Sequence, residues 1–455
     1  MSARAGNSLG IYVSIPFCRS KCTYCNFASG VYPASEHARY VERLLEDLSG
    51  AAGWAHETGV EPTRNVDSVY LGGGTPSLLA PELITKLFRA MHGEFDLDPD
   101  CEITMECAPG QLPAATIEAM VAAGVNRVSL GVQSFIDREA QVSGRLHTRA
   151  IVEDDIARLR GAGIANINVD LIAGLAGQTS ASWEESLDAL IAADTPHASV
   201  YMLEVDEDSR LGREMLAGGA RYYAGLVPGD EAIAAMYERA IERLGDAGLM
   251  QYEISNFARL GFESRHNLRY WRRREYLGVG LDAASMLKGL DDSRSTRAQR
   301  VSESASQQVS ETAEWRRTNP VLRTKTTDDL NEYLAGPCIA ETAWAETVWL
   351  DRVQQHEEAW FLGLRLNAGV DVAALEREFG ADLVRPACEV AERLAHDGLL
   401  EFDGHRARLT QRGRLLSNEV FQEFIGESAS RQVSEPAAIR ATTPAARLPR
   451  LATET

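Results

Sequence analysis

Short apolar runs alternate with amphipathic segments over the first two-thirds of the chain. Apolar runs of strand length occur at residues 10–17, 66–71, 102–106, 127–132, 167–172 and 198–203. Between them, apolar residues recur at helical spacing, as in the segment after Ser35, which we expect to cap a helix. This alternation predicts a parallel α/β fold. The six β/α units predict a partial (β/α)6 barrel, because a closed barrel of this kind needs eight.

The remaining chain contains two polar stretches and one patterned stretch. Residues 291–320 and 427–455 are poor in apolar side chains, which predicts a disordered insertion and a disordered tail. Helical patterns at 353–365 and 383–396, a hairpin turn at Asp403-Gly404 and a helix capped by Thr410 resemble a winged-helix module. We therefore predict a core domain over residues 1–290 and a small C-terminal α+β domain over 321–426.

Charge and composition exclude several function classes. The net charge of -20 at pH 7 argues against nucleic-acid binding, because phosphate neutralisation needs a basic surface. No run of about 18 apolar residues occurs, so no membrane span is expected. The N-terminus lacks the apolar core of a signal peptide. Together with free cysteines, this predicts a cytoplasmic protein.

Three cysteines with the spacing C-x3-C-x2-C follow the first predicted strand. Cys18, Cys22 and Cys25 can supply thiolates to three irons of one [4Fe–4S] cluster, and a typical cluster takes four cysteines. The fourth iron is then open to a small molecule. Zinc is a weaker alternative, because no second Cys/His pair lies at zinc-finger distance. A disulfide framework is weaker still in a chain with seven cysteines, an odd number.

Polar residues end several of the other predicted strands. Gly73, Glu106, Gln133 and Asp170 come at or near the carboxyl ends of successive strands, and Arg145 follows Gln133 in the next connection. In parallel α/β folds the functional site forms at that edge of the sheet. The carboxylates can bind an ammonium group or ribose hydroxyls, and the arginine can bind a carboxylate.

The cysteine spacing, with Tyr24 inside it, resembles the radical S-adenosylmethionine superfamily. Further motifs are similar to the coproporphyrinogen dehydrogenase (HemN/HemW) family, namely Tyr12, Gly72-Gly73-Gly74-Thr75-Pro76, Glu106, and the segments 131–135, 144–148 and 168–172. The resemblance implies a radical SAM core in residues 1–290, with S-adenosylmethionine bound at the open iron. The contacts that it implies to this cofactor are those of Tyr12, Tyr24, Gly73, Gly74, Thr75, Glu106, Gln133, Arg145 and Asp170.

Two features are more similar to the haem chaperone (HemW) branch of that family. Phe27 stands where the dehydrogenases carry a fourth cysteine, and the segment 266–271 (His-Asn-Leu-Arg-Tyr-Trp) matches a His-Asn-x-x-Tyr-Trp signature. The resemblance implies a carrier that binds haem and delivers it to apoproteins, respiratory enzymes among them, without turnover. His266 is then a candidate haem ligand, with arginines at 269 and 272–274 for the propionates. Its alternative is a hydrogen-bonded histidine on a half-buried segment.

The alternative function is oxygen-independent coproporphyrinogen III dehydrogenation through a 5′-deoxyadenosyl radical. Three departures from the family pattern bear on both functions. Ala108 replaces an asparagine, Ala176 a proline and Ala284 a histidine. We expect Cys107 to be a small buried residue and not a metal ligand.

Overall fold

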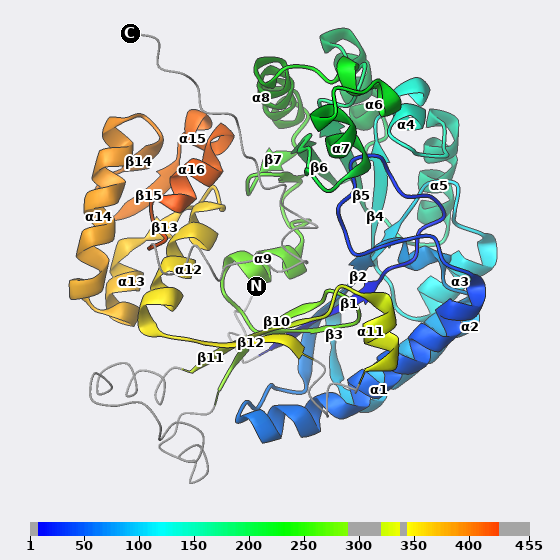
Figure 1. Ribbon diagram of the computed structural model, residues 1–455, viewed down its shortest axis with the longest axis horizontal. Coiled ribbons are helices and arrows are strands. Elements are labelled where there is room, and N and C mark those ends of the chain that lie inside the picture. The colour runs from blue at the N-terminus through cyan, green and yellow to red at the C-terminus, as the bar shows by residue number, and fades with distance from the viewer. Residues whose placement is uncertain (1–7, 290–319, 337–343, 427–455) are drawn as a thin grey trace.

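The computed structural model describes residues 8–289, 320–336 and 344–426. Six parallel strands run side by side in chain order and confirm the predicted partial barrel (Figure 1). They are β1 (Leu9–Ile15), β2 (Asn65–Gly73), β3 (Asp96–Cys107), β4 (Arg127–Gln133), β5 (Asn166–Ala173) and β6 (His197–Met202). The predicted disordered tail lies outside the described residues, and so does the predicted insertion except for Pro320.

Helices follow these strands and cover their outer faces. They are α1 (Ala34–Thr58), α2 (Pro81–Glu94), α3 (Ala114–Ala122), α4 (Asp137–Val142), α5 (Arg149–Gly161), α6 (Ser180–Ala192), α7 (Arg210–Leu216) and α8 (Asp230–Asp246), with short 3-10 turns at Pro76–Leu78 and Arg221–Leu226. The expected cap at Ser35 is wrong. Helix α1 begins at Ala34, two residues before the start that a cap at Ser35 implies. Pro33 is the residue before it, and its ring fixes the backbone there at φ -63°.

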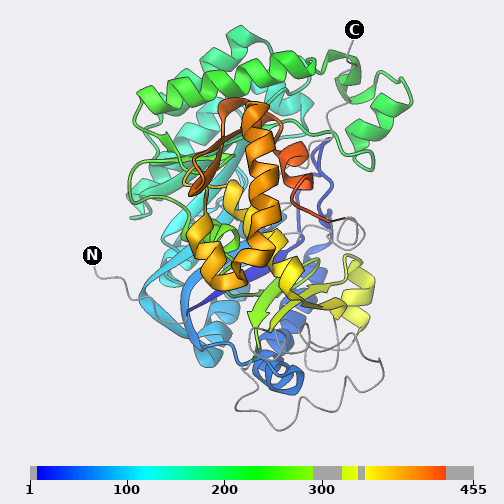
Figure 2. The same cartoon turned by 90° about the vertical axis from the view of Figure 1, so that its left-hand side faces the viewer.

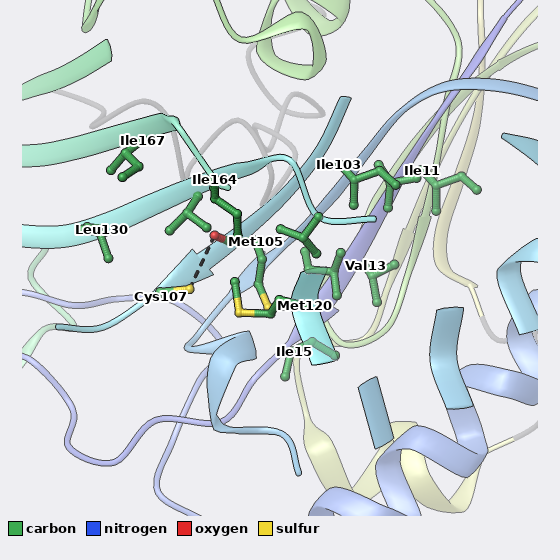
Figure 3. Packing of buried hydrophobic residues seen from close by; sticks show 14 of the residues in the cluster. Ile11, Val13, Ile15, Ile103, Met105, Cys107, Met120, Leu130, Ile164 and Ile167 are labelled. Atoms are coloured by element: carbon green, nitrogen blue, oxygen red, sulfur yellow. Dashed lines mark hydrogen bonds between the residues drawn. The ribbon is translucent and has the colours of Figure 1, made fainter. Parts of the chain in front are cut away.

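The largest hydrophobic core lies between the strands and their covering helices. Figure 3 shows Ile11, Val13 and Ile15 of β1 close to Met105 of β3 and Met120 of α3. Side chains of a strand point alternately to opposite faces, so every second residue of each strand enters this core. The intervening residues face the inside of the barrel, where the site forms.

Further strands extend the sheet beyond both ends of the parallel set. Strands β7 (Met250–Gln251) and β8 (Asn256–Ala258) join β6, while β9 (Tyr276–Val279) pairs in parallel with β1. Antiparallel strands β10 (Ala284–Lys288), β11 (Val321–Thr326) and β12 (Trp344–Leu350) follow β9. The sequence predicts that β11 and β12 belong to the C-terminal domain, whereas their backbone hydrogen bonds join the large sheet. The division into domains stays a prediction.

The C-terminal helices form a group of their own (Figure 1). This group consists of α12 (Arg352–Leu364), α13 (Val372–Phe379), α14 (Ala381–His396), α15 (Gln411–Leu415) and α16 (Ser417–Gln422), with the sheet of β13 (Val370–Asp371), β14 (Leu400–Phe402) and β15 (Arg406–Leu409). Figure 2 shows α14 on the outside of the group. The predicted hairpin at Asp403-Gly404 and the Thr410 cap are confirmed, because β14 pairs with β15 and the Thr410 hydroxyl accepts the Gly413 N–H at 2.9 Å.

Two connecting helices complete the described fold. Helix α9 (Arg265–Trp271) carries the His-Asn-x-x-Tyr-Trp segment and contacts α12, and α11 (Leu330–Ala335) packs on α1. In the part of the chain that the structure describes, no helix is long and apolar enough to cross a membrane.

Candidate cofactor and substrate site

A cavity of about 1090 Å³ opens at the carboxyl ends of the parallel strands. It gathers most of the residues that the sequence predicted for the site, although they come from six separate segments. Those that line it are Cys18, Cys22, Tyr24, Cys25, Gly73, Gly74, Thr75, Glu106, Gln133, Arg145 and Asp170. Tyr12, His266 and the arginines at 269 and 272–274 do not line it.

The cysteine loop is closed at its base by backbone pairing. The Cys18 N–H donates to the Gly30 carbonyl at 2.8 Å, and Phe17 and Gly30 form a β-bridge. Inside the loop, the Lys21 ammonium donates to the carbonyls of Phe27 and Ser29, both at 3.1 Å. The loop therefore has a defined shape that comes from its own backbone.

The three thiols suit a cube of iron and sulfur. Each cysteine is partly exposed to the cavity, and hydroxyls lie at 4.0 Å from two of the sulfurs, Thr75 Oγ1 beside Cys18 and Ser29 Oγ beside Cys25. Within the described ranges, no three His, Cys, Asp or Glu side chains lie close enough to share a single metal ion. A cluster places its cysteines on separate irons, farther apart than thiolates on one zinc at about 2.3 Å from the metal. The donor set fits a [4Fe–4S] cluster.

The glycines after β2 let three strands approach one another closely. A Cβ on Gly74 would lie 2.8 Å from the carbonyl oxygens of Ile15 and Phe17, and a Cβ on Gly72 would lie 3.0 Å from the Glu106 carboxylate. Gly73 has φ +98°, a conformation that favours glycine. The triple glycine therefore joins the base of the cysteine loop to the strand that carries Glu106.

Two half-buried carboxyl groups face the cavity from neighbouring strands. The Tyr70 hydroxyl donates to Glu106 at 2.9 Å, while Ser129 and Asn168 donate to Asp170 at 3.2 and 2.7 Å. Burial, with the charge of Asp170 second, raises the pKa of Glu106 to about 7. Burial also raises the pKa of Asp170. Desolvation disfavours the charged form of both carboxyls, and a bound cation or hydroxyl group would stabilise that form.

A basic group and an amide face these carboxyls. Strand β4 has a register shift between Gly131 and Gln133, and Gln133 adopts φ +69°, which sets the direction of its side chain at the strand end. Gly131 leaves room for Arg145, because a Cβ there would lie 2.8 Å from the guanidinium. The buried Nε of Arg145 has no hydrogen-bond partner among the described residues, which fits an arginine that binds an anionic ligand.

His266 lies inside the protein. Its side chain is 0% exposed, its Nδ1 lies 3.0 Å from the Ser68 hydroxyl, and its Nε2 lies 2.9 Å from the Tyr270 hydroxyl. Burial lowers the pKa of His266, so the ring is neutral at pH 7. This arrangement matches the alternative to haem ligation, a hydrogen-bonded histidine. Haem ligation by His266 stays a prediction, and it requires these hydrogen bonds to break.

The four arginines that follow His266 in the sequence differ in exposure and in ion pairing. Arg269 is buried and pairs with Asp67, and Arg273 binds Glu378 of α13 at 2.6 Å. Arg272 and Arg274 are exposed. Two of the four arginines expected to meet propionates are thus already paired within the protein.

Tyr12 and the substituted family positions are buried. Tyr12 stacks on Tyr70 with ring centroids 6.2 Å apart, so it reaches the site through Tyr70. Cys107 is confirmed as a small buried residue, with its thiol directed to the Met105 carbonyl at 3.7 Å (Figure 3). Ala176 and Ala284 are buried as well.

Sequence reasoning missed a polar layer inside the barrel. The side chains that line the cavity below the predicted site are Arg127, Ser129, Asn168, Ser199, Asn256 and Asn267. Buried parallel strands usually read as continuous apolar runs. Strands β4, β5 and β6 instead alternate polar and apolar residues, and that period of two was the signal that could have found this layer.

Comparisons with known proteins agree with this geometry. Residues 12–190 match the radical SAM superfamily, and residues 350–416 match the HemN C-terminal domain. Proteins called "Heme chaperone HemW" from Lactococcus lactis and Bacillus subtilis are each 32% identical; the alignments cover 91% of this chain and 96% and 99% of theirs.

A solved structure shares the whole architecture. Coproporphyrinogen III oxidase (HemN) from Escherichia coli, described as a radical SAM enzyme, superposes with a TM-score of 0.73 over 92% of this chain and 90% of its own, at 21% identity. At that identity the likeness shows the fold alone. The similarity to the HemW proteins extends over nearly the full length, and the chain therefore belongs to the HemW family of the radical SAM superfamily.

Proposed function

We propose that this chain is a haem chaperone that binds a [4Fe–4S] cluster, S-adenosylmethionine and haem, and delivers haem to acceptor apoproteins in the cytoplasm. One observation carries the proposal. The chain aligns almost end to end with proteins called "Heme chaperone HemW", and its cysteine loop has Phe27 in place of a fourth cysteine. Respiratory enzymes are the proposed acceptors.

The cavity residues have distinct tasks under this proposal. Cys18, Cys22 and Cys25 would each hold one iron of a [4Fe–4S] cluster, which would supply one-electron chemistry and leave one iron for S-adenosylmethionine. Gly73 and Gly74 present backbone without side chains to the methionine end of the ligand. The remaining contacts are assigned to Tyr24, Thr75, Glu106, Gln133, Arg145 and Asp170, with Tyr12 behind Tyr70.

Polar groups of opposite charge divide the ligand between them. The carboxyls of Glu106 and Asp170 suit the ammonium group and ribose hydroxyls, and the Arg145 guanidinium suits the carboxylate. Their burial strengthens each contact, because a buried charge has little water to compete for it. Haem ligation by His266 requires that α9 first release that side chain from Ser68 and Tyr270.

Anaerobic reconstitution followed by haem titration tests the proposal. We expect bound iron and sulfide, a stable Soret band on addition of haem, and transfer of that band to an acceptor apoprotein. Protein that stays colourless and free of iron would overturn the cluster assignment. Oxidative decarboxylation of coproporphyrinogen III, in the presence of reductant and S-adenosylmethionine, would overturn the carrier function in favour of the dehydrogenase.

The dehydrogenase remains the second candidate because of the size of the cavity. Pockets for one small ligand measure about 300–1,000 Å³. The volume of about 1090 Å³ leaves room for a second ligand beside S-adenosylmethionine, and that ligand is either cargo or substrate.

A further inference from the structure

Arg127 is a buried cation without a counterion. It stands at the first position of β4, is 2% exposed and lines the lower part of the cavity. Its Nε has no hydrogen-bond partner, and no carboxylate of the described residues lies within ion-pair distance of its guanidinium. A buried charge that is left unpaired costs several kcal/mol. Such a group is retained at a stability cost, which points to a ligand.

The side chains around Arg127 do not neutralise it. The Arg127 charge acts to lower the pKa of Asp170, but Asp170 already accepts hydrogen bonds from Ser129 and Asn168 and forms no ion pair with Arg127. Burial, with the Arg127 charge second, lowers the pKa of His197, and Arg127 also contributes to the lowered pKa of His266. Both imidazoles are therefore neutral and add no positive charge around Arg127.

Neighbouring polar atoms on the same row of the sheet also lack partners. Thr104 of β3 and Asn166 of β5 pair with Arg127 in register, one on each side. The Thr104 hydroxyl and the side-chain amide oxygen (Oδ1) of Asn166 are both buried atoms and make no hydrogen bond to another described residue. Buried polar atoms in native proteins are normally satisfied, so this row offers Arg127 no protein partner, and Arg127 is the residue of the three that lines the cavity.

Asn267 adds a neutral donor from α9. It lines the same cavity, is buried, and its carboxamide makes no hydrogen bond to another described residue. It is also the second residue of the His-Asn-x-x-Tyr-Trp segment. In this segment His266 holds α9 to β2 through Ser68, while Asn267 is the residue that reaches the cavity.

We propose that Arg127 and Asn267 form a carboxylate subsite on the floor of the cavity, below the cofactor, for an acidic side group of the second ligand. A planar guanidinium binds a carboxylate through two parallel hydrogen bonds. One cation with neutral donors matches a single negative charge. A phosphate dianion fits less well, because Glu106 and Asp170 lie one and two pleats above on the adjoining strands. With haem as the cargo under the proposed function, the acidic group is a propionate.

Iron-free porphyrins test the subsite without any contribution from axial ligation. Full-length protein with reconstituted cluster and S-adenosylmethionine is titrated with protoporphyrin IX and with its dimethyl ester. We expect the diacid to bind at least about ten-fold more tightly than the diester, the range for hydrogen bonds to a charged group. Arg127→Gln should abolish that preference, and Arg43→Gln, which replaces a buried arginine of α1 that pairs with Asp47 and does not line the cavity, should keep it.

Stability separates a ligand-binding role from a structural one. Arg127→Gln should have a ligand-free Tm no lower than the wild type, because it removes an unpaired charge, whereas Arg43→Gln should have a lower Tm, because it leaves the buried Asp47 without its ion pair. A lower Tm for Arg127→Gln, or a diacid preference that persists in it, would overturn the subsite.

A small carboxylate distinguishes failure of the subsite from failure of the proposed function. If the wild type binds neither porphyrin, the haem function fails and the subsite is decided by benzoate with benzamide as control. A rise in Tm with benzoate, absent with benzamide and absent in Arg127→Gln, supports the subsite for another acidic ligand. Equal responses of wild type and Arg127→Gln would overturn it.

Discussion

Replacing Glu106 with glutamine should stabilise the cofactor-free protein, and the gain should grow with pH. The side chain is half-buried, and burial together with Asp170 raises its pKa from 4.5 to about 7. Glutamine keeps an oxygen that can accept from the Tyr70 hydroxyl and carries no charge. The wild type alone must therefore bury an ionised group at high pH.

The sign follows from proton binding in the two states. Between about pH 4.5 and 7 the folded protein holds a proton on Glu106 that the unfolded chain has released. The free energy of unfolding then falls as pH rises through this window and stays lower above it. A displacement from 4.5 to about 7 corresponds to at most about 3 kcal/mol, since the Glu106 side chain is half-buried. Below pH 4.5 this contribution vanishes, and wild type and variant should be similarly stable.

Denaturant unfolding of cluster-free, ligand-free protein at pH 5 and pH 8.5 measures this effect. The variant should gain up to about 3 kcal/mol over wild type between the two pH values. Glu118→Gln is the matched control, because it removes one negative charge from an exposed position of α3. The same Glu106 variant should bind S-adenosylmethionine about ten-fold or more weakly, since it loses a charge-assisted hydrogen bond. A stability difference that is the same at both pH values would refute the reasoning.

Three further changes test other parts of the site. Cys25→Ser should lose most of its iron and sulfide after anaerobic reconstitution, while Cys388→Ser on α14 should keep both, as measured by metal and sulfide analysis. Gly74→Ala should lower the free energy of unfolding by about 1–3 kcal/mol, because its Cβ would meet two carbonyl oxygens at 2.8 Å. Gly93→Ala, in α2 with nothing within 4 Å, should be neutral or stabilising, and equal effects would contradict the close-approach argument. His266→Ala should destabilise haem-free protein by about 2–4 kcal/mol because it removes a fully buried ring and its hydrogen bonds, and an unchanged Tm would show that α9 does not depend on it.

Features that depend on local spacing were predictable from the sequence. The cysteine loop, the triple glycine and the polar strand ends needed only residue type, spacing and the rule that parallel strands present their carboxyl ends at one edge. The state of His266 depends on Ser68, which lies 198 residues away along the chain. No local pattern shows whether such a partner will be in reach.

The pairing of distant strands was not predictable for a related reason. Strands β10 and β11 pair with each other although a long polar segment, residues 290–319, separates them in the sequence. The apolar pattern of β11 and β12 gives strand type but not the partner. The alternation of polar and apolar residues in β4, β5 and β6 was sufficient to predict the polar interior of the barrel. Our sequence analysis used only the residues at the ends of those strands.

The position of β1 in the sheet sets the order in which the protein can mature. This strand, which leads into the cysteine loop, is bordered by β2 on one edge and by β9 on the other. A nascent chain that has not yet reached Val279 leaves one edge of β1 without a partner, and such edges recruit other chains. At 5–20 residues per second, synthesis between Cys25 and Val279 takes on the order of tens of seconds. Under the proposed function, insertion of the cluster would therefore follow the synthesis of β9, late on the ribosome or after release.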